Sequence, residues 1–168
     1  MDNKLNFREH INVKINKGNS IVGIIRRSFT HLTKEIVTKL FKSLVRPHLE
    51  YCHAVWKADK KMDMQSLERV QSRATALVPE LKEKCAMDRL KELKLPCMAY
   101  RSLRGDMVET YKILQGKYDD ESEIAELIEK APEARRTRGH SLKIQGKRWR
   151  TNIMKFNFSN RKVGTWNR

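Results

Sequence analysis

Apolar side chains recur in the first third of the chain at the three- and four-residue intervals that are typical of one face of an α-helix. The first apolar stripe covers residues 7–29 and predicts a long amphipathic helix. A second helix is expected to follow Thr33, whose hydroxyl can accept a hydrogen bond from the first turn. Pro47 interrupts the second stripe. Because proline has no N–H to donate, we expect a kink or a closely packed further helix near Arg46.

Shorter stripes with the same spacing occupy the middle of the chain. Asp63 is expected to cap a third helix that ends before Pro79, and residues 88–93 predict a short helix. A fourth, long helix is expected from Met98 to Gly116, where glycine can adopt the left-handed conformation that ends many helices. The apolar positions of its buried face are predicted to be Leu103, Met107, Tyr111 and Leu114.

The character of the chain changes at Pro132. Residues 123–130 predict one last, acidic helix, whereas residues 141–144 alternate between polar and apolar side chains and predict a short strand. The low numbers of glycine and proline, 7 and 4 in 168 residues, also favour helices. We therefore expect a mainly α fold, with a helical bundle over residues 1–131 and a basic, partly irregular segment over residues 132–168.

The net charge of +16 comes from 36 Lys and Arg against 20 Asp and Glu, and it is unevenly spread. The last 38 residues hold 11 basic side chains and 1 acidic one, whereas residues 61–130 hold 13 and 14. Because a surface of one sign attracts polyanions, the basic segment predicts nucleic acid as the partner. A surface that merely improves solubility is the alternative.

Cations and aromatic rings are mixed in the basic segment, above all at residues 148–150, Arg-Trp-Arg. Such a mixture suits contacts with phosphates and stacking on unpaired bases. For Trp149 and Trp166, the alternative is packing onto the helical body. The residues predicted to form the nucleic-acid-binding surface are Arg26, Arg27, Lys39, Lys42, Arg135, Arg136, Arg138, His140, Lys143, Lys147, Arg148, Trp149, Arg150, Arg161 and Lys162. For the four within the first 60 residues, an ordinary solvated helix face is the alternative.

Catalysis has little support in the sequence. Residues 118–120, Tyr-Asp-Asp, contain the paired carboxylates that can hold two Mg²⁺ ions, but an acidic run follows them and no apolar strand flanks them. We expect a solvated loop there. His48, Cys52 and His53 lie close in sequence, and positions 48 and 52 can share a helix face, but a zinc site needs further ligands that are not evident. The sequence therefore predicts no cofactor, no metal site and no small-molecule substrate.

The three cysteines are widely spaced and form no Cys-x-x-Cys pair, which predicts reduced and mostly buried thiols in an intracellular protein. The amino terminus lacks the apolar stretch of a signal peptide. No run approaches the ~20 apolar residues that a membrane span needs. We therefore expect a cytoplasmic or nuclear protein without a membrane partner.

Several strings of the sequence resemble those of a known family. Residues 39–56 read Lys-Leu-Phe-Lys-Ser-Leu-Val-Arg-Pro-His-Leu-Glu-Tyr-Cys-His-Ala-Val-Trp, and residues 137–142 read Thr-Arg-Gly-His-Ser-Leu. Both strings resemble segments that follow the palm in jockey-like LINE (non-LTR retrotransposon) reverse transcriptases. The other strings that resemble this family, in its order, are residues 70–75, 77–79, 89–90, 93–96, 100–101, 103–107, 158–161 and 166–167.

The resemblance implies a helical, thumb-like region and the basic segment beyond it, which in such RNA-directed DNA polymerases grip the template–primer duplex behind the active site. The fingers, the Mg²⁺-binding palm and the endonuclease lie upstream in the family and are not matched here. The ending at residues 166–168 also departs from the family's Trp-Asn-x-Leu-Pro. We therefore expect a truncated, non-catalytic fragment that binds template–primer duplex or structured RNA, with the rest of such a polymerase as a further candidate partner.

Two other interpretations fit the same sequence. The charge-balanced, amphipathic middle of the chain suits a helical protein-interaction module, which would bind another helical protein. A retroelement relic without a function of its own is the second alternative.

Overall fold

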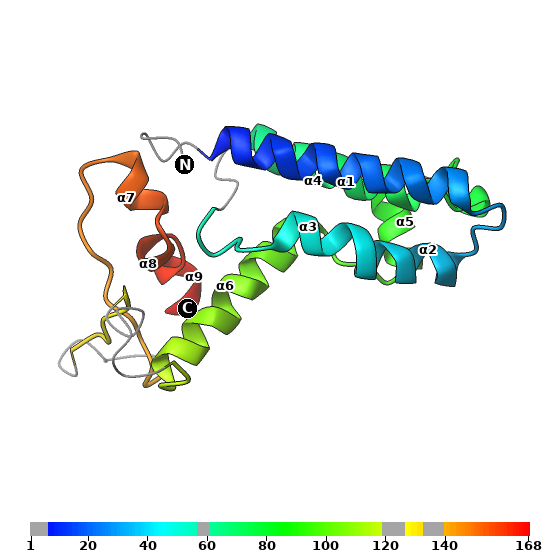
Figure 1. Ribbon diagram of the computed structural model, residues 1–168. Helices are drawn as coiled ribbons and strands as arrows, with labels where there is room; N and C mark the ends of the chain where they lie inside the picture. The colour runs from blue at the N-terminus through cyan, green and yellow to red at the C-terminus, as the bar shows by residue number, and fades with distance from the viewer. Residues whose placement is uncertain (1–6, 57–60, 119–126, 133–139) are drawn as a thin grey trace. The chain divides into compact units, whose positions relative to one another are not determined.

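The computed structural model of the chain describes residues 7–56, 61–118, 127–132 and 140–168 (Figure 1). Nearly all regular structure in these ranges is helical, which confirms the predicted mainly α fold. The chain divides into an amino-terminal unit, Met1–Ser102, and a carboxy-terminal unit, Leu103–Arg168. The division falls within helix α6 (Met98–Leu114), whereas the sequence predicted a boundary after residue 131.

The first two helices of the amino-terminal unit lie where the apolar stripes predict them. Helix α1 (Arg8–Ser28) follows the stripe over residues 7–29. Helix α2 (Lys34–Leu40) begins directly after Thr33, whose hydroxyl accepts a hydrogen bond from the Ile36 N–H at 3.4 Å. The predicted cap is therefore confirmed, and it satisfies a backbone donor that the first helical turn leaves without an intrahelical partner.

A π-helical turn carries the chain past the proline. This turn, η1 (Phe41–Val45), joins α2 to α3 (Arg46–Glu50), and Pro47 lies at the start of α3. Proline is tolerated in the first turn of a helix because the N–H that it lacks has no intrahelical acceptor there. The expected further helix near Arg46 is thus present, and it follows α2 with no loop between them.

Helices α4 (Lys61–Thr75) and α5 (Ala86–Glu92) follow, with the short 3₁₀ turn η2 (Pro79–Leu81) between them. The prediction that Asp63 caps α4 is wrong, because the helix begins two residues earlier and Asp63 lies within its first turn. A carboxylate in the first turn still interacts favourably with the positive end of the helix dipole. Helix α5 overlaps the short helix that was predicted over residues 88–93, but it begins two residues earlier and ends one residue earlier.

The core of this unit lies between α1, α4 and the line formed by α2 and α3. Figure 1 shows α1 alongside α4, with α2 and α3 below it. The helices pack closely at Gly18, where a Cβ atom would lie 3.1 Å from side-chain carbons of both Leu49 and Val70. The buried core side chains are Ile11, Val22, Ile25, Val37, Phe41, Val45, Leu49, Trp56, Leu67, Val70, Ala74, Val78, Leu81, Leu90, Leu93, Leu95 and Met98.

A buried arginine fixes the connection between α4 and α5. The guanidinium of Arg89 donates hydrogen bonds to the Lys84 carbonyl and to the Ser72 hydroxyl, both at 2.8 Å. Arg89 is only 8% exposed. Because hydrogen bonds from a charged donor are stronger than those between neutral groups, this side chain holds the loop before α5 against α4.

The carboxy-terminal unit begins within α6, and this helix ends as predicted. Gly116 has a φ of +61°, in the left-handed region that glycine adopts without strain. Its N–H donates to the Ile113 carbonyl at 3.1 Å, and the next N–H, that of Lys117, donates to the Lys112 carbonyl at 3.0 Å. These bonds satisfy carbonyls that the end of the helix would otherwise leave unpaired.

Beyond α6, the described chain forms short helices and one isolated bridge. The helices are α7 (Asn152–Phe156), α8 (Phe158–Arg161) and α9 (Val163–Trp166). The strand predicted at residues 141–144 is not formed, and only an antiparallel bridge between Lys130 and Ile144 is present there. The pairing does not continue to the neighbouring residues on either side of this bridge.

The acidic helix predicted over residues 123–130 lies only partly within the described residues. Residues 123–126 lie outside the described part of the chain, and residues 127–130 are not α-helical. Ile128 is nevertheless buried, whereas Leu127 is 44% exposed.

The apolar core of the carboxy-terminal unit joins α6 to the basic tail. Its buried members are Ile113, Leu114, Ile128 and Ile144, against which Tyr118, Leu142, Phe158, Val163 and Trp166 pack. Residues on both sides of position 131 thus contribute to one core. This shared core explains why the compact unit begins well before the basic segment does.

The buried face of α6 agrees with the prediction at Leu114, but its other members are displaced by one residue. Asp106 and Thr110 are completely buried, and Ile113 continues their line. Met107 is only half-buried and Tyr111 is 51% exposed, so the prediction that they face the core is wrong. A periodicity of apolar side chains cannot detect a face whose central members are a carboxylate and a hydroxyl.

We expect Gly18 and Gly23, both in α1, to respond in opposite directions to a larger side chain. Gly23→Ala should stabilise the chain by ~0.5–1 kcal/mol, because alanine favours the helix and only the Arg27 Nη1 atom lies near, at 3.9 Å. Gly18→Leu should destabilise it by about 1–3 kcal/mol, because the core offers no room. Urea unfolding followed by circular dichroism measures both changes, and equal effects would contradict the close packing at Gly18.

Candidate nucleic-acid interface

The predicted basic surface is best developed in residues 145–157, which we call the 145–157 segment. Every residue of this segment is exposed. Its amino-terminal end follows Ile144, whose N–H and carbonyl both bond to the Asn167 carboxamide, at 3.0 and 2.9 Å. A side chain that accepts and donates in this way replaces a neighbouring strand, so the backbone is fixed where the segment begins.

A second carboxamide holds the segment at two more points. Asn160 Oδ1 accepts a hydrogen bond from the Lys147 N–H at 3.0 Å, and its Nδ2 donates to the Met154 carbonyl at 2.8 Å. Asn160 itself is 9% exposed. The two asparagines, which we call the asparagine clamp, therefore restrain the backbone of the segment while its side chains remain in solvent.

The charge of the 145–157 segment is entirely positive. Its cations are Lys147, Arg148, Arg150 and Lys155, and it contains no Asp or Glu. Lys147 Nζ lies 2.8 Å from Glu129 Oε1, but both side chains are about half exposed, so this ion pair contributes little to stability. The segment thus presents several donors that can contact phosphates without disturbing the core.

Trp149 and Trp166 were each expected either to stack on bases or to pack onto the helical body, and they differ in the structure. Trp166 packs against the core of the carboxy-terminal unit, and its indole N–H donates to the Leu142 carbonyl at 2.7 Å. Trp149 is 50% exposed and belongs to no apolar cluster among the described residues. Trp166 is therefore a structural residue, whereas Trp149 remains available for an external partner.

His140 and Lys143 contribute to structure as well as to charge. The His140 Nδ1 accepts a hydrogen bond from the Leu142 N–H at 3.2 Å, so its Nε2 donates to the Trp166 carbonyl at 2.8 Å. Its ring meets the Trp166 indole edge to face, with centroids 5.7 Å apart. Lys143 is half-buried, and its carbonyl accepts a bond from the Ala131 N–H at 2.8 Å.

Arg161 was predicted to be part of the basic surface, and the structure corrects this. Its guanidinium donates to both carboxylate oxygens of Asp106, at 2.8 and 3.1 Å, and the two side chains are 5% and 0% exposed. The bidentate geometry compensates for the loss of hydration of both charges. The side chain is therefore committed to the interior of the carboxy-terminal unit.

Lys162 was also predicted as a surface cation, and it is 1% exposed. Its Nζ atom has no hydrogen-bond partner among the described residues and lies 3.0 Å from the centroid of the Phe158 ring. The pKa of its ammonium group is lowered to about 7, chiefly by burial and also by the Arg161 cation, while the Asp106 and Glu109 carboxylates partly offset this lowering. A lysine in this position cannot serve as an exposed phosphate contact.

The remaining predicted cations divide into two groups. Arg26 and Arg27 in the last turn of α1, Lys39 in α2 and Lys42 in η1 are all exposed in the amino-terminal unit. Their positions suit an ordinary solvated helix face as well as a phosphate contact, so both interpretations remain. The cations that lie outside the described residues are Arg135, Arg136 and Arg138.

The structure gives no arrangement for metal chemistry in its described ranges. Within them, no group of three His, Cys, Asp or Glu side chains is placed to hold a metal ion. His48 lies in α3, but Cys52 lies beyond the end of that helix with a φ of +54°. The two residues therefore do not share a helix face, although their spacing would allow it. In the Tyr-Asp-Asp string, Tyr118 is half-buried, and residues 119 and 120 lie outside the described part.

The cysteines are free, and most of them are not buried. Cys52 and Cys85 are exposed and Cys97 is half-buried, so the prediction of mostly buried thiols is wrong. The Cys85 thiol caps α5 by accepting a bond from the Asp88 N–H at 3.4 Å, which keeps it at the surface. As for membrane spans, none of the helices in the described chain combines the necessary length and hydropathy.

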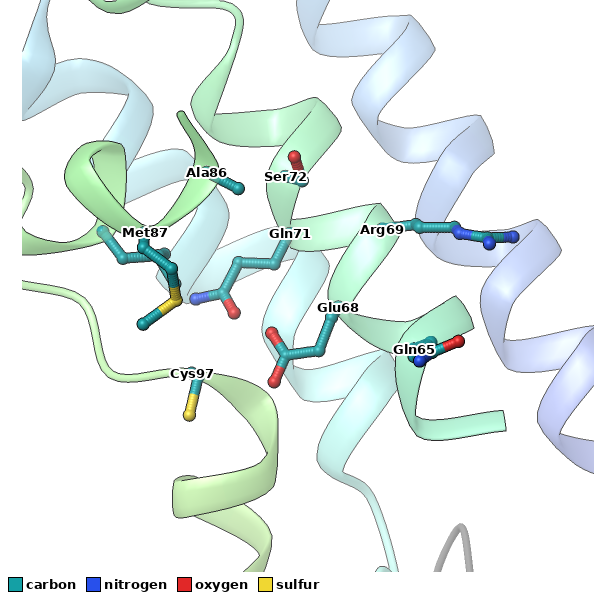
Figure 2. Close-up of a pocket in the computed structure, with 9 residues that line it drawn as sticks. Gln65, Glu68, Arg69, Gln71, Ser72, Ala86, Met87 and Cys97 are labelled. Atoms are coloured by element: carbon teal, nitrogen blue, oxygen red, sulfur yellow. The ribbon is translucent and has the colours of Figure 1, made fainter. Parts of the chain in front are cut away.

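A pocket of about 640 Å³ opens in the amino-terminal unit, and sequence reasoning did not anticipate it. Figure 2 shows Glu68 and Gln71 reaching from α4 toward Met87 of α5 and toward Cys97. Glu68 accepts a hydrogen bond from the Ala99 N–H at 3.0 Å, and Gln71 donates to the Pro96 carbonyl at 3.0 Å. These polar groups brace the start of α6, so the pocket suits an apolar side chain better than a reaction.

The residues that sequence reasoning missed are those that position the interface. Asp106, Asn160 and Asn167 carry no apolar signal, and two of them lie in a stretch that reads as irregular. Their partners are backbone groups and a cation that lie 6 to 55 residues away. Only the occurrence of Asp106, Thr110 and Ile113 at helical spacing could have suggested a buried polar face.

Removing the carboxylate of Asp106 should unfold the carboxy-terminal unit more readily. Asp106→Asn keeps the shape but leaves the Arg161 cation buried without its counter-charge, and we expect a loss of ~3–5 kcal/mol. The matched control is Glu109→Gln, three residues away, whose ion pair with Lys112 spans 3.5 Å and is partly exposed. We expect that control to lose less than about 1 kcal/mol. Thermal unfolding distinguishes the two, and equal losses would contradict a dominant role of the buried pair.

Replacing Lys162 should change how stability depends on pH. The pKa is about 7 in the folded chain against 10.5 for the free side chain, so between these pH values the unfolded state binds the extra proton. The stability of the native chain therefore rises with pH across this window. Lys162→Met should be more stable at pH 7, by about 4 kcal/mol, and this advantage should vanish as the pH approaches 10.5.

Urea unfolding of both proteins at pH 7 and at higher pH measures that difference. Lys155→Met is the control, because Lys155 is exposed and should give no comparable gain. If the difference in free energy of unfolding between the native chain and Lys162→Met is the same at every pH in the window, unfolding does not protonate the Lys162 amine.

Comparisons with other proteins leave the chain without an assigned family. No family model, no curated protein and no solved structure matches it. The function of the chain therefore has to be inferred from its own residues.

Proposed function

We propose that this chain binds nucleic acid through a basic surface and carries no catalytic centre of its own, as the thumb-like and post-thumb region of a retrotransposon reverse transcriptase would. The observation that carries the proposal is the 145–157 segment. It presents four exposed cations and no carboxylate, and the asparagine clamp holds its backbone at Lys147 and Met154 and at the preceding residue, Ile144. Phosphates are the ligand that such a surface fits best.

The clamp supports the proposal because it lowers the free-energy cost of binding. A loop that is disordered before binding must lose backbone freedom when it meets a ligand. The backbone at Lys147 and Met154 is already bonded to Asn160, so less freedom is left to lose. The exposed side chains between these points can then turn toward phosphates.

The sequence resemblance supports the same function from another direction. The strings at residues 158–161 and 166–167, which resemble the closing block of the jockey-like polymerases, contain Asn160, Arg161 and Asn167. These are the residues that clamp the segment and anchor it to α6. The resembling residues thus serve to present a basic surface, which is what a region that binds nucleic acid requires.

Reversing the charge of the segment should weaken binding and reduce its dependence on salt. We expect the triple variant Lys147→Glu, Arg148→Glu and Arg150→Glu to lose at least about tenfold in affinity at low salt, and the slope of log K against log [salt] to fall by about 2–3. Fluorescence anisotropy with duplex DNA, an RNA–DNA hybrid and a structured RNA measures both quantities. The control reverses Lys82, Lys91 and Lys94, which are exposed in the amino-terminal unit.

The result that would overturn this function is clear-cut. If the native chain binds none of the three ligands with sub-micromolar affinity at low salt, the proposal fails. If the control variant loses as much affinity as the segment variant, total charge and not the 145–157 segment is responsible.

A further inference from the structure

We propose that the Trp149 indole is a stacking platform for an unpaired base, so that the 145–157 segment takes single-stranded nucleotides, RNA or DNA, in preference to a closed duplex. This inference rests on the proposed nucleic-acid-binding function and names the ligand of that surface more narrowly. The three tryptophans in the described chain differ in how far they are buried and hydrogen-bonded.

Two of the tryptophans are fully engaged within the fold. Trp56 is 3% exposed, and its indole N–H donates to the Tyr51 carbonyl at 2.6 Å. Trp166 donates to the Leu142 carbonyl and packs on the core of its unit. Trp149 is 50% exposed, and its indole N–H bonds to no group in the described part of the chain. The large apolar ring of Trp149 therefore contributes little to the stability of the fold.

The surroundings of Trp149 favour nucleotides over other apolar partners. Arg148 and Arg150 adjoin it in the chain, and both are exposed. An indole binds the face of any base, while guanidinium groups contact the phosphates on either side of that base. Because Lys147 and Met154 are held by Asn160, the backbone that carries these groups is restrained before a strand arrives.

Stacking separates unpaired from paired nucleotides. In a duplex each base face is already covered by its neighbours, so an external indole reaches only edges and backbone unless it unstacks a step at considerable cost. In a single strand the faces are accessible. Phe156, 37% exposed, is a weaker platform because the Lys155 Nζ atom lies 5.3 Å from its ring centroid.

The same composition also invites comparison with an anionic membrane surface. Ile153 and Met154 in α7 are about half exposed beside the cations. However, α7 has only five residues, and a helix that lies in a membrane interface needs a long apolar face. The cations also adjoin Trp149 directly instead of lying on a separate face. These features favour nucleic acid as the ligand.

The test compares three labelled ligands on the full chain by fluorescence anisotropy: an oligouridine RNA and an oligothymidine DNA, each of about 12 nucleotides, and a blunt duplex of the same length. The native chain should prefer both single strands. Trp149→Ala should weaken their binding about tenfold, while leaving duplex binding within about twofold of native. Trp149→Phe should retain most of the single-strand affinity, because a phenyl ring also stacks.

Tyr111→Ala is the matched control, since Tyr111 is 51% exposed on α6 of the same unit. It should change none of the three affinities. Tryptophan fluorescence provides a second readout: the single strands should quench it in the native chain and much less in Trp149→Phe. This readout remains decisive even if Trp149→Ala fails to fold.

The outcomes separate the two proposals. Equal binding of single strands and duplex, unchanged in Trp149→Ala, would overturn the stacking platform and leave the nucleic-acid-binding function intact. Binding of none of the ligands at low salt would overturn the function itself. Tighter binding to phosphatidylserine vesicles than to either single strand would assign the surface to membranes and overturn the inference. A preference between RNA and DNA that Trp149→Ala abolishes would identify which strand the platform takes.

Discussion

The carboxy-terminal unit depends on one ion pair, between Asp106 of α6 and Arg161 of α8. Both side chains have left water, so each charge requires the other, and the two parallel hydrogen bonds fix the direction as well as the distance between the helices. Asn160 directly precedes Arg161 in the chain, and Asn167 follows one short helix later. Fixing Arg161 on α6 therefore also places the two carboxamides that hold the exposed segment.

The two units achieve their stability by different means. The amino-terminal unit packs apolar stripes, and Gly18 lets α1 approach Leu49 and Val70 closely. The carboxy-terminal unit has a small apolar core and relies on buried polar contacts, above all the Asp106–Arg161 pair. It also buries Lys162, and the burial of its ammonium group is unfavourable at neutral pH. Such a unit tolerates fewer changes at its polar positions, because an unpaired buried charge costs more than a lost apolar contact.

Sequence patterns were reliable where structure is decided locally. The stripe of α1, the Thr33 cap and the Gly116 terminus each depend on residues within one or two helical turns, and each was predicted. Burial of Asp106 and Lys162 depends on partners far along the chain, and counting charges assigns such groups to the surface by default. The same limit applies to Trp149 and Trp166, because only the fold decides which indole packs on a core and donates its N–H to a distant carbonyl.

The asparagine clamp has a consequence for how this surface can change over evolutionary time. Both asparagines lie outside the 145–157 segment, and they bond to main-chain atoms of Ile144, Lys147 and Met154, not to side chains. Main-chain atoms are the same whichever amino acid occupies a position. The identities of the exposed residues between them are thus largely decoupled from folding. Point substitutions in the 145–157 segment can therefore change which ligand is preferred, while the fold that presents the segment stays the same.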